Sequence, residues 1–515
     1  MSLDAPIRQD ETTTIAPRTL TTWKIITLIV GAFTPLAVVA GTVPLAFAFG
    51  GPSTTLAFII AGAVIALFCV GYVQMVRRIT RPGAFYSYIA RGLGRPAGVG
   101  GAMVAVVGYV FGFIGAIAIQ AFLAHEIIKS LFGIDAPWQV LLVIIVFIVG
   151  FLAYRKINLS AYVVGVIVIG EVVLLVVLAI AIFARNGIAA FPVEVIQPSV
   201  FGIGTWSVAL IFAFLCFQGY EAGALYAPEA KRPEKTVPRA LYGALVLFVA
   251  VLVLSTWTLT SVSGVEGQME VILENGLGAW VLAVVADYLG PVGLWLFSLF
   301  TLFAQMAVAI SITNFMSRYY NSLAREELLP RYLGRLNRYG APYSAVFTLL
   351  GLGLVVPLVS AMVGIDPYTQ LSSVAFGVGA IAATTLQAMA SWAVVGFFMR
   401  RPASERHWWK TFMAPALAGV LLVLATVIEI FGIQWITGVE ASWTMILPVL
   451  VLAALVLGIA FGFWLKKNKP RTYLDLAAGD SPEEAAALRS ARIQSRSDDD
   501  VDRSAATDRD FDPVP

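Results

Sequence analysis

The sequence predicts an all-helical membrane protein that crosses the bilayer many times. Of its 515 residues, 59% are hydrophobic and only 13% are charged, and the mean hydropathy is +0.85. A soluble domain carries about 25% charged residues. The net charge of +3 is too small to indicate nucleic-acid binding. Cys69 and Cys216 lie inside apolar runs, so with only two histidines we expect no disulfide framework, no metal site and no cofactor.

The apolar runs predict twelve membrane spans, since about 20 apolar residues cross the hydrocarbon core. The predicted spans are 25–49, 54–76, 99–132, 138–153, 159–184, 204–227, 238–262, 291–322, 343–363, 370–398, 412–434 and 443–465. Residues 264–290 are predicted to be an outer loop. This loop carries a helical pattern around residues 280–288, and we expect it to cap the outer mouth.

The distribution of Lys and Arg predicts the orientation of the chain. If the N-terminus is cytoplasmic, all but two of the 34 basic residues fall on the cytoplasmic side, and only Lys129 and Arg185 fall outside. Cytoplasmic loops carry an excess of Lys and Arg. We therefore expect a multi-pass protein of the cell membrane with both termini in the cytoplasm.

The two ends of the chain are polar. Residues 1–23 are predicted to be a cytoplasmic N-terminal tail without a cleavable signal peptide, because no short apolar region with a cleavage site occurs there. Residues 470–515 are predicted to be a disordered, acidic cytoplasmic tail, since they are polar and contain Asp498, Asp499 and Asp500 in a row.

Two spans are interrupted at matching places. The first contains residues 34–41, with Pro35 inside the apolar run, and the sixth contains residues 217–223, with Gly219 and Glu221. Pro and Gly weaken helices, and irregular backbone at membrane depth is tolerated where it lines a cavity or is buried in protein. Broken spans in corresponding positions of two halves indicate the binding site of a transporter.

Three segments resemble the amino acid–polyamine–organocation superfamily of permeases. They are residues 34–51, residues 81–94 with the sequence RPGAFYSYIARGLG, and residues 212–240. A weaker match covers residues 317–330. The resemblance extends over roughly residues 24–465 and implies an amino acid permease of bacterial type.

The resemblance also implies the LeuT-type fold, which has two inverted repeats of five spans each and, in this family, two additional spans. Residues 24–184 then form the first repeat and residues 204–398 the second. Residues 411–465 contain spans eleven and twelve.

The breaks suggest how an amino acid is held. A half-helix that begins after a break presents N–H donors and a positive dipole end to a carboxylate, and a half-helix that ends there offers carbonyls to an ammonium. We expect the carboxylate near the backbone of the first break, with help from Gly219. The residues expected there are Ala37, Val38, Val39, Ala40 and Gly41.

Aromatic side chains flank the second break. The resemblance implies that an aromatic here closes over the substrate, which makes Phe214 and Phe217 candidates. Packing in the core is the alternative for each of them.

Two carboxyl groups lie inside apolar sequence. Glu221 is expected to cap the half-helix after the second break or to contact a substrate amine. Glu171 lies in the fifth span, where some relatives of the family carry a Lys that this sequence lacks. A carboxyl group away from water favours its protonated form, so Glu171 is the candidate for proton coupling. A permanently neutral acid is the alternative.

Ser311, Thr313 and Asn314 are polar residues of the eighth span and are candidates for contact with a coupling ion, because sodium-coupled relatives of this fold place hydroxyls there. The alternative is that their side chains bond back to helix carbonyls.

These observations predict a secondary active transporter that imports amino acids or related amines by alternating access around the two breaks, driven by protons. A sodium-coupled carrier, an exchanger and a nutrient sensor that does not transport stay open as alternatives. No Walker motif is present, and no catalytic constellation indicates an enzyme. The expected partners are the small-molecule substrate, a proton or a sodium ion, and the lipid bilayer.

Overall fold

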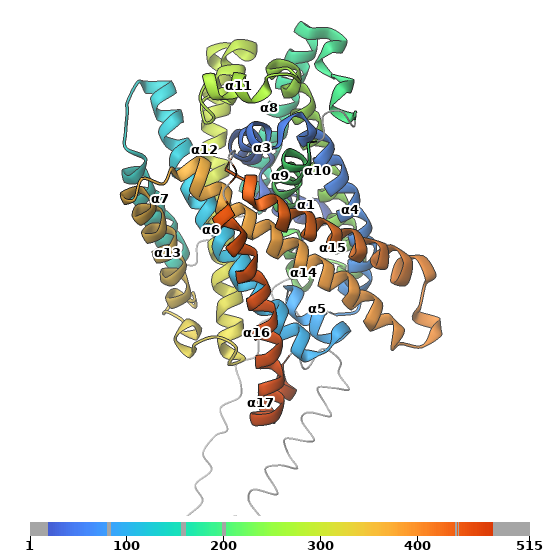
Figure 1. Ribbon diagram of the computed structural model, residues 1–515. Helices are drawn as coiled ribbons and strands as arrows, with labels where there is room; N and C mark the ends of the chain where they lie inside the picture. Colours follow the sequence, from blue (N-terminus) through green and yellow to red (C-terminus); the bar gives the residue numbers. More distant parts are fainter. Residues whose placement is uncertain are drawn as a thin grey trace, which may run out of the picture.

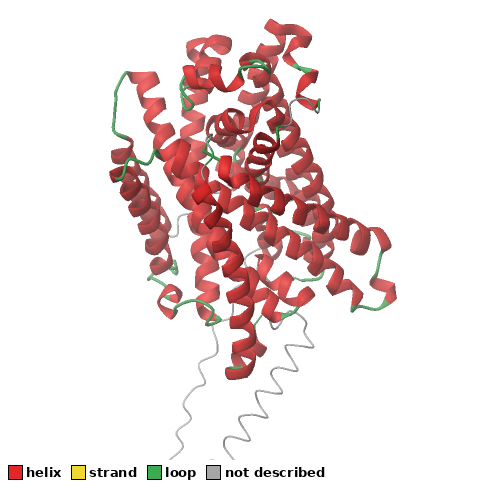
Figure 2. Cartoon of the chain, in the orientation of Figure 1, coloured by secondary structure: helices red, strands yellow, loops and turns green. Residues whose placement is uncertain are grey.

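A computed structural model describes residues 19–79, 84–155, 161–197, 202–437, 440 and 442–476. The regular structure in these ranges is helical, as Figure 2 shows, apart from one isolated bridge between Leu20 and Ala230. The prediction of an all-helical fold is therefore confirmed.

The chain has sixteen α-helices of six residues or more in its described part. They are α1 (Thr22–Phe33), α3 (Val43–Gly50), α4 (Thr54–Val76), α5 (Ala84–Leu93), α6 (Arg95–Phe132), α7 (Trp138–Tyr154), α8 (Ala161–Asn186), α9 (Ile203–Leu215), α10 (Pro233–Ser263), α11 (Gln268–Glu274), α12 (Trp280–Arg325), α13 (Tyr343–Met362), α14 (Ser373–Met399), α15 (Ala414–Gly432), α16 (Leu447–Asn468) and α17 (Pro470–Asp475).

Further helical segments connect these helices. The α-helical one is α2 (Pro35–Ala37); the π-helical ones are Val38–Thr42, Pro367–Ser372 and Trp408–Met413; and the 3₁₀ segments are Gly51–Ser53, Gly187–Ala190, Val193–Ile196, Tyr220–Glu229, Arg331–Gly334, Ala403–Glu405, Ile433–Trp435 and Ser442–Ile446.

Within the described ranges, nine helices are long and apolar enough to cross a membrane. One of them runs over Thr22–Val76 and so contains the first two predicted spans. Two shorter apolar helices, Trp138–Tyr154 and Thr205–Leu215, lie at the fourth and sixth predicted spans. The structure thus shows a protein with many membrane spans, and the number twelve stays a prediction.

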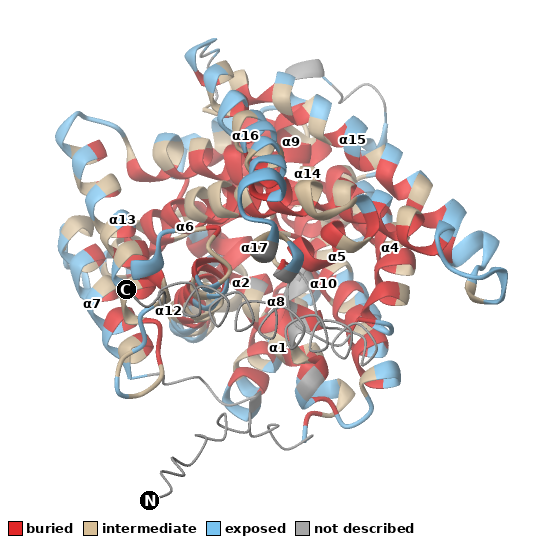
Figure 3. Cartoon of the chain, turned by 90° about the horizontal axis from the view of Figure 1, so that it is seen from below, coloured by how far each residue is buried: buried red, intermediate tan, exposed pale blue. Residues whose placement is uncertain are grey.

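Helix α14 lies in the middle of the bundle. It packs against α6, α15, α5 and α9 (Figure 1). In the view of Figure 3, buried residues gather toward the centre and exposed ones toward the rim. Large apolar side chains stay exposed at many rim positions, Phe147, Val246 and Leu457 among them. An apolar exposed surface of this extent fits contact with lipid.

The helix predicted around residues 280–288 forms the first part of α12. Helix α12 begins at Trp280 and bends at Gly290, which has φ 66° and ψ −171°. The part before the bend packs inward, since Trp280 is buried and its ring lies 5.9 Å from the ring of Phe47. Only glycine adopts this backbone conformation without strain, so Gly290 separates residues 280–289 from the span that follows, and the capping of the outer mouth stays a prediction.

Both ends of the described chain are attached to loops on the predicted cytoplasmic side. Leu20 donates its N–H to the carbonyl of Glu229, and Arg95 donates to the carbonyls of Leu474 and Leu476. The Glu327 carboxylate accepts hydrogen bonds from Lys469 and Arg331. These two cations, Lys469 more than Arg331, hold the pKa of Glu327 below its usual range. The region predicted to be disordered from residue 470 therefore begins with an ordered helix, α17, and residues 1–18 and 477–515 lie outside the described residues.

Candidate functional site

The first break involves fewer residues than predicted. Helix α1 ends at Phe33, Thr34 has φ 30° and ψ 104°, and Pro35 begins α2. Residues 38–42 form a π-helical turn that leads into α3, and all five predicted binding residues, 37–41, are buried. Proline suits the first position of a helix, because a backbone N–H at that position would have no partner within the helix. Only Thr34 therefore leaves the helical region, and the next turn is widened instead of unwound.

Glu171 lies against this break. Its Oε2 accepts a hydrogen bond of 3.4 Å from the N–H of Leu36, the first N–H that α2 offers after the proline. Glu171 is completely buried on α8, and its Oε1 has no partner among the described residues. Helix α8 approaches α1 closely, since a Cβ on Gly31 would lie 2.3 Å from Val164. Two features that the sequence predicted separately are thus brought together.

The second break is present where it was predicted. Helix α9 ends at Leu215, Gly219 adopts the left-handed conformation with φ 93°, and residues 220–229 form a 3₁₀ helix. A residue with a side chain is strained at such a φ, which explains the glycine. The backbone of Glu221 lies in this 3₁₀ helix, and its side chain lies outside what the structure describes. Its predicted capping role therefore stays a prediction.

The two aromatic candidates at this break are buried. Phe214 is 1% exposed and Phe217 is 2% exposed. The ring of Phe217 lies 5.7 Å from that of Phe248 on α10. A small cavity lies between the two broken spans and is lined from α1 by Ile29 and Val30, and otherwise by Phe217, Tyr220, Ala244, Leu245 and Phe248.

Two residues of the second break form contacts that the sequence analysis missed. The Tyr220 hydroxyl donates to the carbonyl of Leu241 at 2.9 Å and lies 3.0 Å from the sulfur of Cys69. The Gln218 amide donates to the carbonyls of Gly108 at 3.3 Å and Gly379 at 3.4 Å. The break is therefore tied to α4, α10, α6 and α14.

Glycines on α6 make room for the Gln218 side chain. A Cβ on Gly112 would lie 2.6 Å from Gln218 Oε1, so a larger residue here would displace the Gln218 side chain. The repeated small residues of the third span were the sequence signal for this close approach.

Helix α14 and the turn before it form a third wall of the site. The Tyr368 hydroxyl donates to the carbonyl of Gly41 at 2.7 Å, and its ring stacks on Phe122 at 4.8 Å. Gln387 donates to the carbonyl of Phe217 at 3.3 Å. Helix α14 and the turn that leads into it thus contact both breaks together, and no short motif indicates this because Tyr368 lies 327 residues from Gly41.

The family profile described as "Amino acid permease" matches residues 24–395, which include both breaks. The chain belongs to this amino acid permease family. The permease is 23% identical over 372 residues to the "Branched-chain amino acid permease BcaP" of Lactococcus lactis subsp. cremoris, a match that covers 65% of this chain and 75% of the relative. It is 24% identical over 363 residues to the "Amino-acid permease RocC" of Bacillus subtilis, with coverage of 67% and 72%.

A solved structure shows the fold. The permease resembles the "Crystal structure of MhsT in complex with L-phenylalanine" with a TM-score of 0.56, 14% identity and coverage of 80% of this chain and 99% of the other. The permease therefore has a fold of LeuT type. Membership in the permease family also confirms a membrane transporter and not an enzyme.

The ion-contact candidates lie on α12. Thr313 is fully buried, and its hydroxyl has no partner among the described residues, so it does not bond back to its own helix. The carbonyl of Asn314 accepts from the Ser317 hydroxyl at 3.2 Å. Ser311 is partly exposed. No group of three or more His, Cys, Asp or Glu residues that could hold a metal occurs in the described part of the permease.

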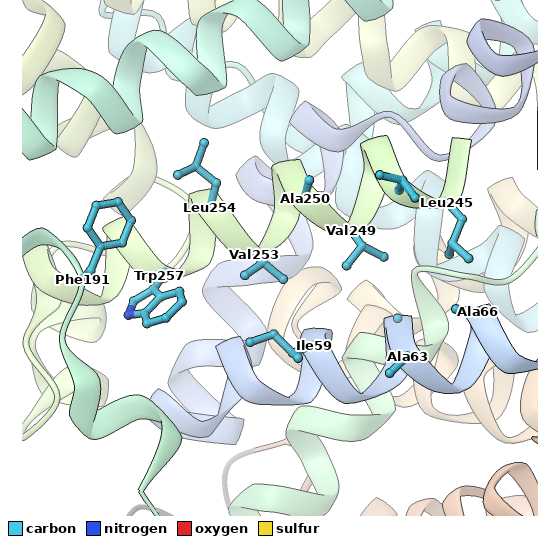
Figure 4. A pocket seen from close by; sticks show the side chains of 12 residues that line it. Ile59, Ala63, Ala66, Phe191, Leu245, Val249, Ala250, Val253, Leu254 and Trp257 are labelled. Carbon is cyan, nitrogen blue, oxygen red and sulfur yellow. The ribbon is translucent and has the colours of Figure 1, made fainter. Parts of the chain in front are cut away.

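An apolar groove lies away from the two breaks. Figure 4 shows an apolar groove of about 600 Å³ between α4 and α10, lined by residues such as Ile59, Val249 and Val253. The Trp257 indole at its end already donates to the carbonyl of Pro192 at 2.9 Å. The groove offers nothing to the charged groups of an amino acid, and its lining suits hydrocarbon.

Replacing Tyr368 tests the wall formed by α14. In Tyr368→Phe the ring still stacks on Phe122, but the Gly41 carbonyl loses a buried hydrogen bond, so we expect a loss of about 1 kcal/mol of stability. Thermal unfolding in detergent measures this loss. The exposed Tyr162→Phe on α8 is the control and should unfold like the native protein. Equal melting temperatures for all three proteins would show that this contact contributes nothing.

Proposed function

We propose that this permease imports amino acids across the cell membrane by alternating access around the two breaks, and that protons drive the uptake. The single observation that carries the proposal is the contact of the Glu171 carboxylate with the Leu36 N–H at the first break. The inverted repeats 24–184 and 204–398, the extra spans in 411–465 and the cytoplasmic position of both termini belong to this proposal and follow from the resemblance to known permeases.

Glu171 offers a direct means of coupling. The N-terminal end of α2 favours an anion, and the side chain of Glu171 occupies its first free N–H. A substrate carboxylate near residues 37–41 would compete with an ionised Glu171, because two anions repel one another in a medium of low dielectric constant. A proton on Glu171 removes this repulsion. Proton binding and substrate binding therefore favour one another.

The lining of the site supports a neutral, apolar amino acid as the substrate. A Cβ on Gly41 would contact Leu123 at 3.0 Å and Ile119 at 3.1 Å, and the ring of Phe217 at the second break packs on that of Phe248. The relatives named for branched-chain amino acids support the same class. Apolar pockets with a few placed polar groups bind apolar ligands.

A thermal-shift screen tests the substrate class. We expect leucine, isoleucine, valine or phenylalanine to raise the melting temperature of the purified permease, since a ligand at about 100 times its Kd stabilises by about 2.7 kcal/mol. Lysine and ethanolamine, at equal concentration, are the comparison ligands. Stabilisation by these cations and not by the apolar amino acids would contradict the proposed class.

Sodium coupling is the second candidate, and the buried Thr313 hydroxyl without a partner is the observation that favours it. Under proton coupling, an imposed sodium gradient should not drive uptake into proteoliposomes, and Ser311→Ala and Thr313→Val should keep pH-driven uptake. Accumulation driven by sodium and lost in Thr313→Val would establish sodium as the coupling ion. Uphill uptake into vesicles without internal amino acid would exclude both an obligate exchanger and a sensor that does not transport.

A further inference from the structure

A second carboxyl group is buried far from the first. Glu429 lies on α15 and is completely inaccessible to solvent. Its Oε2 is 2.7 Å from the hydroxyl of Thr384 on α14, and the Thr426 hydroxyl lies 3.0 Å from the same Thr384 oxygen. Glu429 Oε1 has no partner among the described residues. A buried ionisable group with so few partners inside a membrane indicates a functional site.

Among the residues that the structure describes, no cation lies beside Glu429. The elements packed against α15 are α14, α4, α9 and the helical turns at its two ends. Their titratable groups are Cys69 and Tyr72 on α4 and Lys410 in the turn before α15. Lys410 and Tyr72 lie at the opposite end of α15, where Gly71 contacts Pro415, and Cys69 contacts Tyr220. A charged carboxylate without a counter-ion is costly at this place, so its neutral form is favoured.

Hydroxyl groups of α14 and α15 lie around Glu429. The Thr384 hydroxyl lies 3.1 Å from the carbonyl of Ala380, and the Thr426 hydroxyl lies 2.8 Å from that of Leu422. Carbonyls only accept hydrogen bonds, and each threonine has a single hydrogen to donate. The shortest of these contacts is the one in which the Thr384 hydroxyl donates to Glu429 Oε2, at 2.7 Å. One neutral donor, with Oε1 left without a partner among the described residues, compensates a buried charge only in part, which favours the protonated acid.

We propose that Glu429 is a second proton-binding site of this permease, and that its protonation keeps α15 packed against α14. Helix α14 carries Gln387, which binds the Phe217 carbonyl, and follows Tyr368, which binds the Gly41 carbonyl. A proton on Glu429 therefore holds in place the helix that contacts both breaks. Ionisation of Glu429 places a negative charge without a counter-ion between α14 and α15, and the cost of burying this charge separates the two helices. This site works whether Glu171 couples transport or not.

Infrared spectroscopy of the purified full-length permease tests the proton directly, because a protonated carboxyl group has its own carbonyl stretch. The measurement uses Glu171→Gln as background, so that Glu429 is the buried acid under observation. We expect a carbonyl band at neutral pH that disappears on the further change Glu429→Gln and stays on the change Glu274→Gln at an exposed site. A spectrum that Glu429→Gln leaves unchanged would overturn the proposal.

The second measurement follows thermal unfolding with pH. Under the proposal, Glu429 is neutral in the folded protein and ionises in the unfolded chain. At a pH above the ordinary pKa of Glu, unfolding therefore releases a proton, and the free energy of unfolding falls as pH rises. Glu429→Gln should remove the part of this loss of stability that is due to Glu429. Thr384→Val keeps the acid but removes its partner, and should lose stability at a lower pH than the native protein. Identical pH dependence in the native protein and both variants would show that Glu429 binds no proton in the folded state.

Transport distinguishes this site from the coupling site. Glu429→Gln resembles the protonated acid, so it should keep uptake driven by a pH gradient and keep it at alkaline pH, where the native protein loses it. Loss of gradient-driven uptake in Glu429→Gln, with exchange retained, would place coupling at Glu429 and overturn its role as a structural proton site. Failure of Glu171→Gln to change coupling would affect only the proposed function.

Discussion

Glu171→Gln should keep amino acid exchange and lose uphill uptake driven by a pH gradient. The amide resembles the protonated acid and cannot release a proton, so it removes the competition with a substrate carboxylate in every state of the cycle. Uptake by the native protein should rise as the external pH falls, because protonation from outside frees the N–H of Leu36. In Glu171→Gln this dependence should disappear.

Proteoliposomes with imposed pH gradients measure both activities in one preparation. Counterflow of labelled amino acid reports exchange, and accumulation above the external concentration reports coupling. Glu274→Gln, on the exposed surface of α11, is the matched control and should accumulate substrate like the native protein. Accumulation that persists in Glu171→Gln would show that the coupling proton binds elsewhere.

Gly41→Val should weaken amino acid binding by at least about 100-fold, which corresponds to about 2.7 kcal/mol. The reason is space: a Cβ at this position already meets Leu123 at 3.0 Å and Ile119 at 3.1 Å, and valine adds two methyl groups. The Gly41 carbonyl also accepts from Tyr368, so any shift of the backbone disturbs the wall formed by α14. Calorimetry with an apolar amino acid measures the loss.

Gly351→Val is the control for this substitution. Gly351 lies inside α13, and a Cβ there meets no atom within 4 Å. The control should fold and bind like the native protein, which separates the loss of space at the site from the general cost of a β-branched residue in a helix. Native affinity in Gly41→Val would remove the first break from the binding site.

The sequence predicted the helices of this protein well because each long apolar run is itself the signal. Pro35 and Gly219, which mark the two predicted breaks, also lie where the chain bends, and their backbone chemistry shows this before any contact is known. The number of residues in the first break was predicted less well. Helical hydrogen bonds resume directly after the proline, so small residues such as Gly41 widen the turn without unwinding it.

The arrangement of the site depended on contacts that no local pattern encodes. Glu171 was identified as a lone acid in an apolar span, but its position at Leu36 comes from the packing of α8 against α1. The contacts of Tyr368 and Gln387 could not be predicted from the sequence, because a single polar residue in a helix has many possible neighbours. Glu429 escaped as well, since it lies near the end of an apolar run, where a carboxylate ordinarily faces water.

The contact between Cys69 and Tyr220 gives the native chain a built-in reporter. Its two thiols are both buried, and each lies at the second break: Cys69 beside the Tyr220 hydroxyl, and Cys216 one residue after α9 ends. Neither can be alkylated while the break stays packed, because a thiol must reach water to react. The rate of alkylation by a membrane-permeant maleimide thus follows the opening of this segment, with no label to engineer and no cysteine to remove.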